Sequence, residues 1–211
     1  MAGTNGSNGT AVYGASGAES ASYTPPALMQ FSTTTDASAH YTWLFGGTFI
    51  GSVDSLWRFN NTTGQWAWMT GSPVYSSPLP VNGLSGVESA SYTPGGRYGA
   101  AMWADQHGYI WLYGGFAYDT ANALGYMNDL WRYNIATNKW VYINGSPGSV
   151  NVTTAGLGTL NTISQSNISG GSSYGVAWYY GTYAYVFYGY GYGTSGQGRL
   201  NTFQRTNLYT N

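Results

Sequence analysis

The feature that most constrains this chain is an internal repeat. "GAESASYTP" at residues 17–25 recurs as "GVESASYTP" at 86–94, and "DSLWRFNNTTGQW" at 54–66 recurs as "NDLWRYNIATNKW" at 128–140. A third, weaker copy of the second phrase, "LNTFQRTNLYTN", occupies residues 200–211. The offsets of 69 and 74 residues give a period near 70. A long fixed period of this kind indicates a solenoid or a propeller.

The local pattern within each repeat predicts an all-β fold. Short apolar and β-branched runs alternate with Gly, Asn, Asp and Ser turns. Glycine, 32 of 211 residues, interrupts almost every window of 12 residues, at a cost of about 1 kcal/mol each in a helix. Four strands per repeat are typical of a propeller blade. We expect strands at residues 28–36, 41–46, 54–60 and 65–70, at 98–104, 109–114, 129–134 and 139–144, and at 174–180, 183–189 and 201–206.

These residues resemble the kelch motif of β-propellers, and most closely the kelch-like proteins with long repeats. The motif has a hydrophobic run that ends in Gly-Gly, then an aromatic residue, and a Trp seven residues after it. The matching residues are Gly46, Gly47, Phe59 and Trp66 in the first unit, and Gly114, Gly115, Tyr133 and Trp140 in the second. The glycines should take φ > 0 or pass close to a neighbouring backbone. The tryptophans should pack between blades.

The three units depart from the motif in different ways. Unit one lacks the Gly-Arg step that ends at Arg97. Unit three has Gly189-Tyr190 where Gly-Gly is expected, and Gln204 where unit two has Trp131. The third blade is therefore expected to be the least regular.

The resemblance implies a partial kelch-like β-propeller made of three four-stranded antiparallel blades. Residues 1–211 are expected to form a single segment, with blade 1 at about 28–70, blade 2 at about 98–144 and blade 3 at about 174–211. Asn211 aligns with Asn138, two residues before the expected Trp, so blade 3 should lack its outer strand. Residues 1–5 of this or another copy are the candidates to complete it.

Three blades are fewer than the four to eight of a usual ring. We therefore expect other copies of the chain, or further blades of a longer chain, as partners. Two copies could close a six-bladed ring, and head-to-tail joining without closure would give a filament. The intermolecular contact is expected at residues 1–12 and 200–211.

Charge and cysteine content exclude several classes of protein. Asp, Glu, Lys and Arg make up 6% of the chain and the net charge is −1, with no basic cluster to neutralise the phosphates of a nucleic acid. No apolar run is long enough for a membrane span, and "MAGTNGSNGT" has no features of a signal peptide. The absence of cysteine excludes disulfides and cysteine-ligated metals. Aromatic residues, at 18%, argue against disorder.

Low charge and Asn-x-Ser/Thr sequons favour an extracellular or cell-surface protein. The possible glycosylation sites are Asn5, Asn8, Asn60, Asn61, Asn144, Asn151 and Asn167.

The residues predict no active site, cofactor or metal. Kelch-type propellers include copper radical oxidases, but copper needs imidazole or thiolate ligands. The two histidines, His40 and His107, precede the second strand of their units, where turn residues are expected. Glu19 and Glu88 are repeat equivalents, which points to a structural role. Asp119 is the one loop acid without a repeat partner.

Two further sets of polar residues also repeat. Asp54 and Asp129, 75 residues apart, both open the third strand. Arg58 and Arg132 lie within that strand, and Arg205 matches them in unit three. We expect these arginines to form structural hydrogen bonds, with the preceding blade as one candidate partner.

Long loops are expected on one face of the array, where binding residues usually lie. Their aromatic residues Tyr75, Tyr92, Phe116 and Tyr118 could face a ligand or fold back on the loops. Three functions follow. The first is an extracellular structural or adhesive module that assembles, as a ring or filament, through incomplete blade edges. The alternative is a lectin-like propeller that binds glycans on the long-loop face. The third is a remnant of a propeller enzyme.

Overall fold

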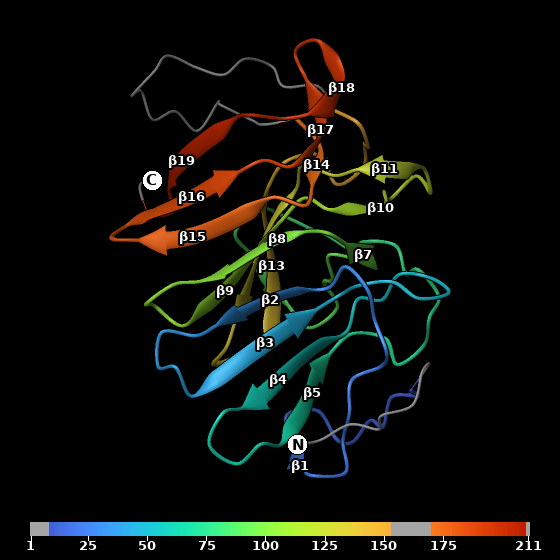
Figure 1. Ribbon diagram of the computed structural model, residues 1–211, viewed down its shortest axis with the longest axis vertical. Helices are drawn as coiled ribbons and strands as arrows, with labels where there is room; N and C mark the ends of the chain where they lie inside the picture. The colour runs from blue at the N-terminus through green and yellow to red at the C-terminus, as the bar shows by residue number, and fades with distance from the viewer. Residues whose placement is uncertain (1–8, 153–169, 210–211) are drawn as a thin grey trace.

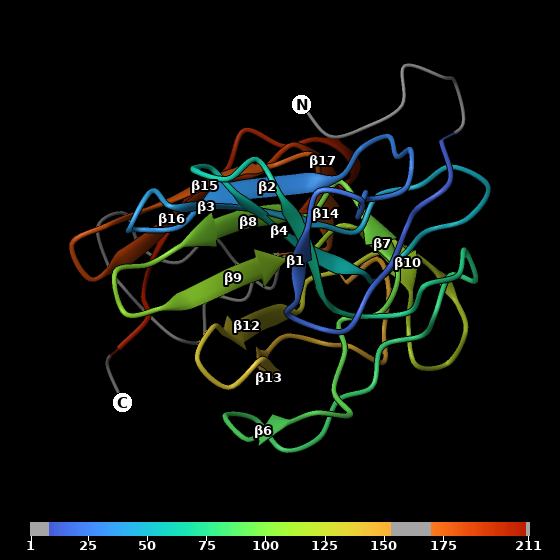
Figure 2. The ribbon, with the colours of Figure 1, turned by 90° about the horizontal axis from the view of Figure 1, so that it is seen from below.

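The computed structural model describes residues 9–152 and 170–209, and within them every regular element is a β-strand. The strands form antiparallel sheets, which confirms the all-β prediction. Three larger sheets, which we call sheets 1, 2 and 3, follow one another along the long axis of the molecule in chain order (Figure 1). Figure 2 looks along this axis from below, and strands of all three sheets run across the view.

Sheets 1 and 2 have the same five-stranded plan. In sheet 1 the order is β1 (Glu19–Ser20), β5 (Trp66–Thr70), β4 (Leu56–Asn60), β3 (Tyr41–Phe45) and β2 (Ser32–Thr35). In sheet 2 it is β6 (Glu88–Ser89), β13 (Lys139–Asn144), β12 (Leu130–Asn134), β9 (Tyr109–Tyr113) and β8 (Ala101–Ala104). Sheet 3 has, among the described residues, β15 (Val176–Tyr180), β16 (Tyr183–Phe187) and β19 (Phe203–Asn207).

The eleven strands expected from the sequence are all present, with ends that differ by a few residues. The short strands β1 and β6 were not expected. Both come from the "ESASYTP" repeat, and each pairs antiparallel with the outer strand of its sheet, with Glu19 opposite Ala67 and Glu88 opposite Val141. Sheets 1 and 2 therefore begin earlier in the chain than residues 28 and 98.

The hydrophobic core lies between the sheets, in two clusters. The first is formed by sheets 1 and 2 and includes Trp43, Phe45, Leu112 and Trp140. The second is formed by sheets 2 and 3. Sheet 2 is thus covered on both faces, because alternate side chains of each strand point to opposite neighbours.

The two motif tryptophans differ in their surroundings. Trp140 is 1% exposed and its ring lies 5.5 Å from that of Phe45 in sheet 1, as expected for packing between sheets. Trp66 is only half-buried and packs against Phe59 and Trp57 of its own sheet. No sheet among the described residues lies on that side of sheet 1, so for Trp66 packing between blades stays a prediction.

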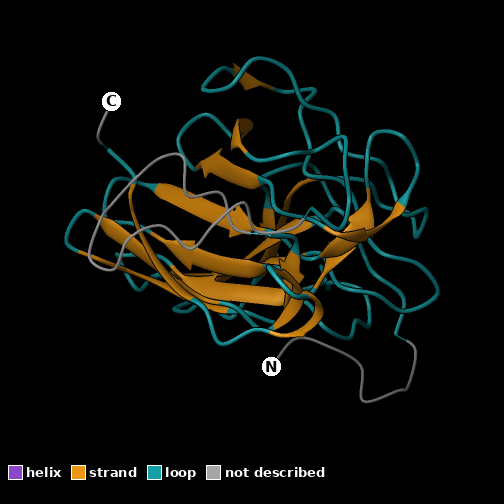
Figure 3. Cartoon of the chain, turned by 90° about the horizontal axis from the view of Figure 1, so that it is seen from above, coloured by secondary structure: helices purple, strands orange, loops and turns teal. Residues whose placement is uncertain are grey.

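Two three-stranded sheets lie at the side opposite the tight turns (Figures 1 and 3). One contains β7 (Arg97–Tyr98), β10 (Phe116–Tyr118) and β11 (Leu124–Tyr126). The other contains β14 (Ser172–Ser173), β17 (Tyr190–Gly193) and β18 (Gly196–Arg199). Residues 115–128 and 190–200, which the sequence predicts as long loops between strands, are therefore mostly β-hairpins.

The tandem glycines follow the second strand and meet the next sheet. Gly46 and Gly114 have φ of +65° and +64°, which confirms the expected left-handed backbone. A Cβ on Gly46 would lie 2.4 Å from the carbonyl oxygen of Arg97, so close approach also excludes a side chain. In the third repeat, Gly189 accepts the N–H of Leu200. Gly47 and Gly115 accept the equivalent bonds, from Val53 and Met127. Gly189 is therefore the second residue of the pair, and Tyr188-Gly189 takes the place of Gly-Gly. The predicted pair, Gly189-Tyr190, was wrong by one residue.

Candidate functional site

A buried ion pair joins β7 of a hairpin sheet to the residue before β12 of sheet 2. Arg97 and Asp129 are both fully buried, and the two guanidinium Nη atoms donate to the two carboxylate oxygens at 2.7 and 2.9 Å. The guanidinium also donates to the carbonyl oxygens of Gly114 and Pro94, and the indole of Trp131 donates to Asp129. With these partners the pair is a structural feature of the core.

The prediction that Asp54 and Asp129 are equivalent was wrong by one residue. Asp54 accepts the backbone N–H of Ser72 at 2.7 Å. In sheet 2 the same bond, from Ser146, goes to Asn128 at 2.9 Å. Asp129 therefore takes the place of Ser55 in sheet 1, as the 74-residue offset of the two tryptophan phrases also indicates.

The repeated arginines have structural partners within their own sheets, rather than in the preceding one. Arg58 forms a salt bridge of 2.9 Å with Glu19 on β1 and lies 4.3 Å from the ring centroid of Tyr41. Arg132 and Arg205 lie over the equivalent rings, Tyr109 and Tyr183, at 4.3 and 4.6 Å.

Glu88 takes the place of Glu19 in sheet 2. It accepts hydrogen bonds from Asn134 and Thr137, and the bond from Asn134 lowers the pKa of its carboxyl. Both glutamates thus hold a short fifth strand against the sheet.

The histidines lie in exposed tight turns, as expected. His40 precedes β3, and His107 precedes β9 and packs edge-on against Tyr209. Among the described residues no group of three His, Asp or Glu side chains is placed to hold a metal ion. Asp119, the acid without an equivalent in the other repeats, is buried. Its carboxylate accepts the backbone N–H groups of Ala121 and Ala123, so it stabilises its own hairpin.

The four aromatic residues expected on the long loops do not form one site. Tyr75 packs against Phe49, and Tyr92 packs against the core between sheets 1 and 2. Phe116 and Tyr118 lie on β10, both half-buried. At least Tyr75 and Tyr92 therefore fold back on the protein instead of facing a ligand.

Phe116 instead belongs to a cluster that the sequence did not predict, which we call the tyrosine cluster. Its members come from the two hairpin sheets and the turn before β15, and are Tyr98, Phe116, Tyr126, Tyr174, Tyr190 and Tyr192. Ring centroids of neighbouring members lie 4.9 to 6.1 Å apart. Burial raises the pKa of the Tyr98, Tyr126 and Tyr174 hydroxyls.

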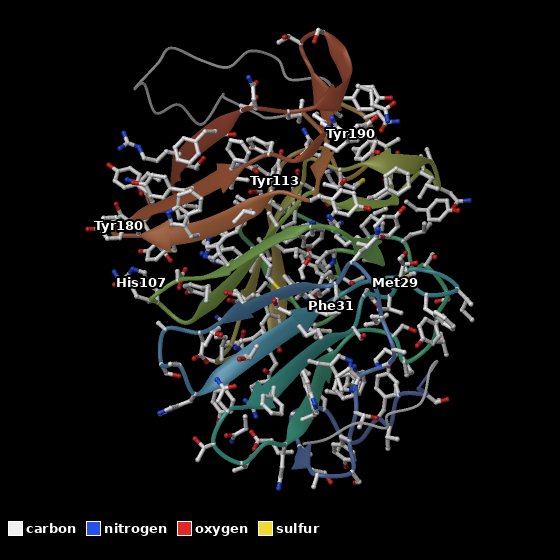
Figure 4. The ribbon with its side chains drawn as sticks, in the orientation of Figure 1. Met29, Phe31, His107, Tyr113, Tyr180 and Tyr190 are labelled. Carbon is white, nitrogen blue, oxygen red and sulfur yellow. The ribbon has the colours of Figure 1, made fainter. Side chains whose placement is uncertain are left out.

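Sheet 3 has one face against sheet 2 and one face open to solvent. The covered face includes Ala184 and Val186. The open face, which we call the outer face of sheet 3, consists of Val176, Trp178, Tyr180, Tyr183, Tyr185, Phe187, Phe203 and Arg205. Exposure is 64% for Val176, 44% for Trp178, 75% for Tyr180, 46% for Phe187 and 52% for Phe203. Figure 4 shows Tyr180 at the margin of this sheet, far from Tyr190.

The rings on this face are arranged across the strands. Trp178 and Tyr185 are stacked with an interplanar angle of 6°, and Tyr185 is also stacked with Phe203. The stacked rings turn their flat sides toward one another, so they offer edges to an incoming surface. That geometry suits packing against another sheet better than stacking on a sugar ring.

The last strand of sheet 3 leaves one edge open. β19 pairs with β16, and no strand among the described residues pairs with its other edge. The chain then turns toward sheet 2, where the hydroxyl of Tyr209 donates to Asp105. Burial, reinforced by that carboxylate, raises the pKa of Tyr209. Within residues 170–209, sheet 3 has no fourth strand. Residues 1–5, which were expected to supply one, lie outside the described residues.

The sequons differ in their availability. Asn144 is exposed at the end of β13, whereas the amide nitrogen of Asn60 donates to Glu19 and the amide oxygen of Asn151 accepts from Tyr126. Asn61 is exposed and hydrogen-bonded to Ala39. Asn5, Asn8 and Asn167 lie outside the described residues.

Sequence reasoning missed the outer face of sheet 3, although a signal was present. In "VAWYYGTYAYVFYG" (176–189), both alternating sets of residues are apolar or aromatic. A strand with two apolar faces needs cover on both sides, and the structure shows cover on one.

Comparisons with known proteins support the fold alone. No family model and no curated protein matches the sequence. Among solved structures, YjhT is similar with a TM-score of 0.50 and 16% identity, over 80% of this chain and 36% of YjhT. The chain thus spans about a third of that structure. The part of the chain that the structure describes contains no helix with the length and apolarity needed to cross a membrane.

Proposed function

We propose that sheets 1, 2 and 3 are successive blades of a kelch-like β-propeller segment. The segment serves as an extracellular structural or adhesive module that assembles with other copies or with further blades. The outer face of sheet 3 carries this proposal. Its residues occupy the repeat positions that are buried in sheet 2, with Trp178 at the position of Trp103 and Phe187 at that of Tyr113.

Two physical costs make assembly the best-supported function. A contiguous apolar face of this kind is rarely left exposed on a protein that acts alone. No strand among the described residues pairs with the outer edge of β19, and such an edge is a place where another strand can add. A partner that covers both would remove both costs. The low charge, the absence of cysteine and an exposed sequon at Asn144 support the extracellular setting.

The test is the mass of the 211-residue chain in solution by light scattering, over about 1 to 100 µM. We expect particles larger than the 22.6 kDa monomer, and a W178S/F203S double variant that remains monomeric. Leu84→Ser is the matched control, because Leu84 is 77% exposed and lies away from sheet 3. A monodisperse monomer across this range would overturn the proposal.

A second candidate function, glycan binding by a lectin-like propeller, is favoured by the tyrosine cluster. Phenol rings with protonated hydroxyls can stack on sugars and hydrogen-bond to them. A glycan array should then show binding that Tyr190→Ala removes and Tyr180→Ala leaves unchanged. This candidate would be eliminated if the unmodified chain bound no glycan, or if the Tyr190→Ala and Tyr180→Ala variants bound equally well.

A further inference from the structure

The contact between successive sheets is built from the same three backbone hydrogen bonds each time. Between sheets 1 and 2, Gly47 N–H donates to Arg97 at 2.9 Å, Arg97 N–H donates to Val53 at 3.3 Å, and Gly99 N–H donates to Gln30 at 2.8 Å. All three acceptors are carbonyl oxygens. These bonds lie beside the inner strands β2 and β8, which are neighbours in space.

Between sheets 2 and 3 the set is repeated at equivalent positions. Gly115 N–H donates to Ser172 at 2.8 Å, Ser172 N–H donates to Met127 at 3.0 Å, and Tyr174 N–H donates to Gly99 at 2.7 Å. Gly99 therefore donates to one sheet and accepts from the other, as a link in a chain of identical contacts.

The two ends of this series are complementary. At the sheet 3 end, the positions that would continue it are the N–H of Gly189 and the carbonyl groups of Leu200 and Tyr174. At the sheet 1 end they are the N–H and carbonyl of Leu28 and the N–H of Gln30. Each donor at one end has its acceptor at the other.

The backbone at both ends already has the shape of the internal contact. Gln30 and Tyr174 have φ of +58° and +57°, close to the +64° of Gly99 between them. Non-glycine residues rarely adopt this left-handed conformation, because it brings Cβ close to the following carbonyl oxygen. The ends are thus pre-shaped for the same three bonds.

We propose that the outer face of sheet 3 docks against the free face of sheet 1 of a second copy, head to tail. The three predicted bonds run from Gly189 to Leu28, from Leu28 to Leu200 and from Gln30 to Tyr174. This inference rests on the proposed function and names its partner and its interface. A ring of two copies and an open filament share this contact, and differ only in whether the rotation closes.

The receiving face of sheet 1 is less apolar than the internal faces along its inner strands, while its outer strands carry Trp57 and Trp68, against which Tyr13 packs. Thr33 and Thr42 occupy the positions of Met102 and Ile110, next to the almost buried Leu44. Phe31, 46% exposed, lies at its rim near Met29 (Figure 4). The contact should therefore be weaker than the one between sheets 1 and 2, and reversible on dilution.

Crosslinking tests the pairing of the two ends, because the chain has no cysteine of its own. Variants Gln30→Cys and Tyr174→Cys are mixed and treated with a short thiol crosslinker. We expect a covalent dimer from the mixture and monomer from either variant alone. A dimer from Tyr174→Cys alone would reveal symmetric pairing of two sheet 3 faces, and would overturn the head-to-tail contact while leaving assembly in place.

A capping experiment gives a second, independent readout by light scattering. Thr33→Arg should block the receiving face and lower the association constant about ten-fold or more, whereas Thr62→Arg, in an exposed turn, should not. Mixing Thr33→Arg with the W178S/F203S variant should give dimers and nothing larger, because each protein retains one competent face. If the chain assembles but Thr33→Arg has no effect, this interface is wrong. If the unmodified chain stays monomeric, both proposals fail.

Discussion

Sheets 2 and 3 carry the same type of residue at equivalent positions, yet they have different surroundings. In sheet 2, Trp103 and Tyr113 are 3% and 9% exposed, because sheet 3 covers them. In sheet 3, the equivalent Trp178 and Phe187 are 44% and 46% exposed. The comparison teaches that the residues of sheet 3 are suited to an interface that the described chain does not complete.

The polar anchoring of the two sheets also differs. Arg97 ties sheet 2 to sheet 1 through its backbone and to Asp129 through its guanidinium. At the equivalent position sheet 3 has Ser172, which makes the same backbone bonds without a buried charge. Sheet 2 should therefore be the more rigidly held of the two.

Breaking the buried ion pair should have the largest effect on this difference. Arg97→Met would leave Asp129 buried without its partner, and should reduce the free energy of unfolding by about 3 to 5 kcal/mol. Urea denaturation followed by tryptophan fluorescence measures it. An R97M/D129L double variant should lose less than the sum of the single losses, and additive losses would contradict a coupled pair.

Truncating the equivalent tryptophans should separate stability from assembly. Trp103→Ala removes a buried side chain and should cost about 3 to 5 kcal/mol, whereas Trp178→Ala should cost about 1 kcal/mol because its side chain is partly solvated and cross-strand packed. Thermal melts of both variants, at a dilution where the protein is monomeric, make the comparison. Equal losses at the two positions would show that the outer face of sheet 3 is already covered in the folded monomer.

Acid should weaken the fifth strand of sheet 2 by a smaller amount. The pKa of Glu88 is lowered in the folded protein, so its contribution is present above the unfolded pKa and is lost as pH falls through the folded pKa. Glu88→Gln should therefore reduce the loss of melting temperature between pH 6 and about pH 3. Glu88 is partly solvated, and a shift of a few degrees at most is expected. An identical pH profile for the variant would assign the acid sensitivity to other carboxyls.

The repeat determined most of the fold. The apolar alternation and turn residues located eleven strands, and the Gly-Gly positions indicated the positive φ that Gly46 and Gly114 adopt. The repeat also predicted a structural role for Glu19 and Glu88, because both glutamates occupy the same position of their units. The strand β1 was missed because two residues, Glu19–Ser20, are too few to show a period.

The tertiary structure decided what lies against what. An offset of 75 residues placed Asp54 opposite Asp129, whereas the 74-residue offset of the two tryptophan phrases and the hydrogen bonds both place it opposite Asn128. The Arg97–Asp129 pair joins residues 32 positions apart, a distance over which local pattern carries no information. Alternation showed that sheet 3 has two apolar faces. Which face is covered depends on packing between sheets, and that follows from the position of every strand together.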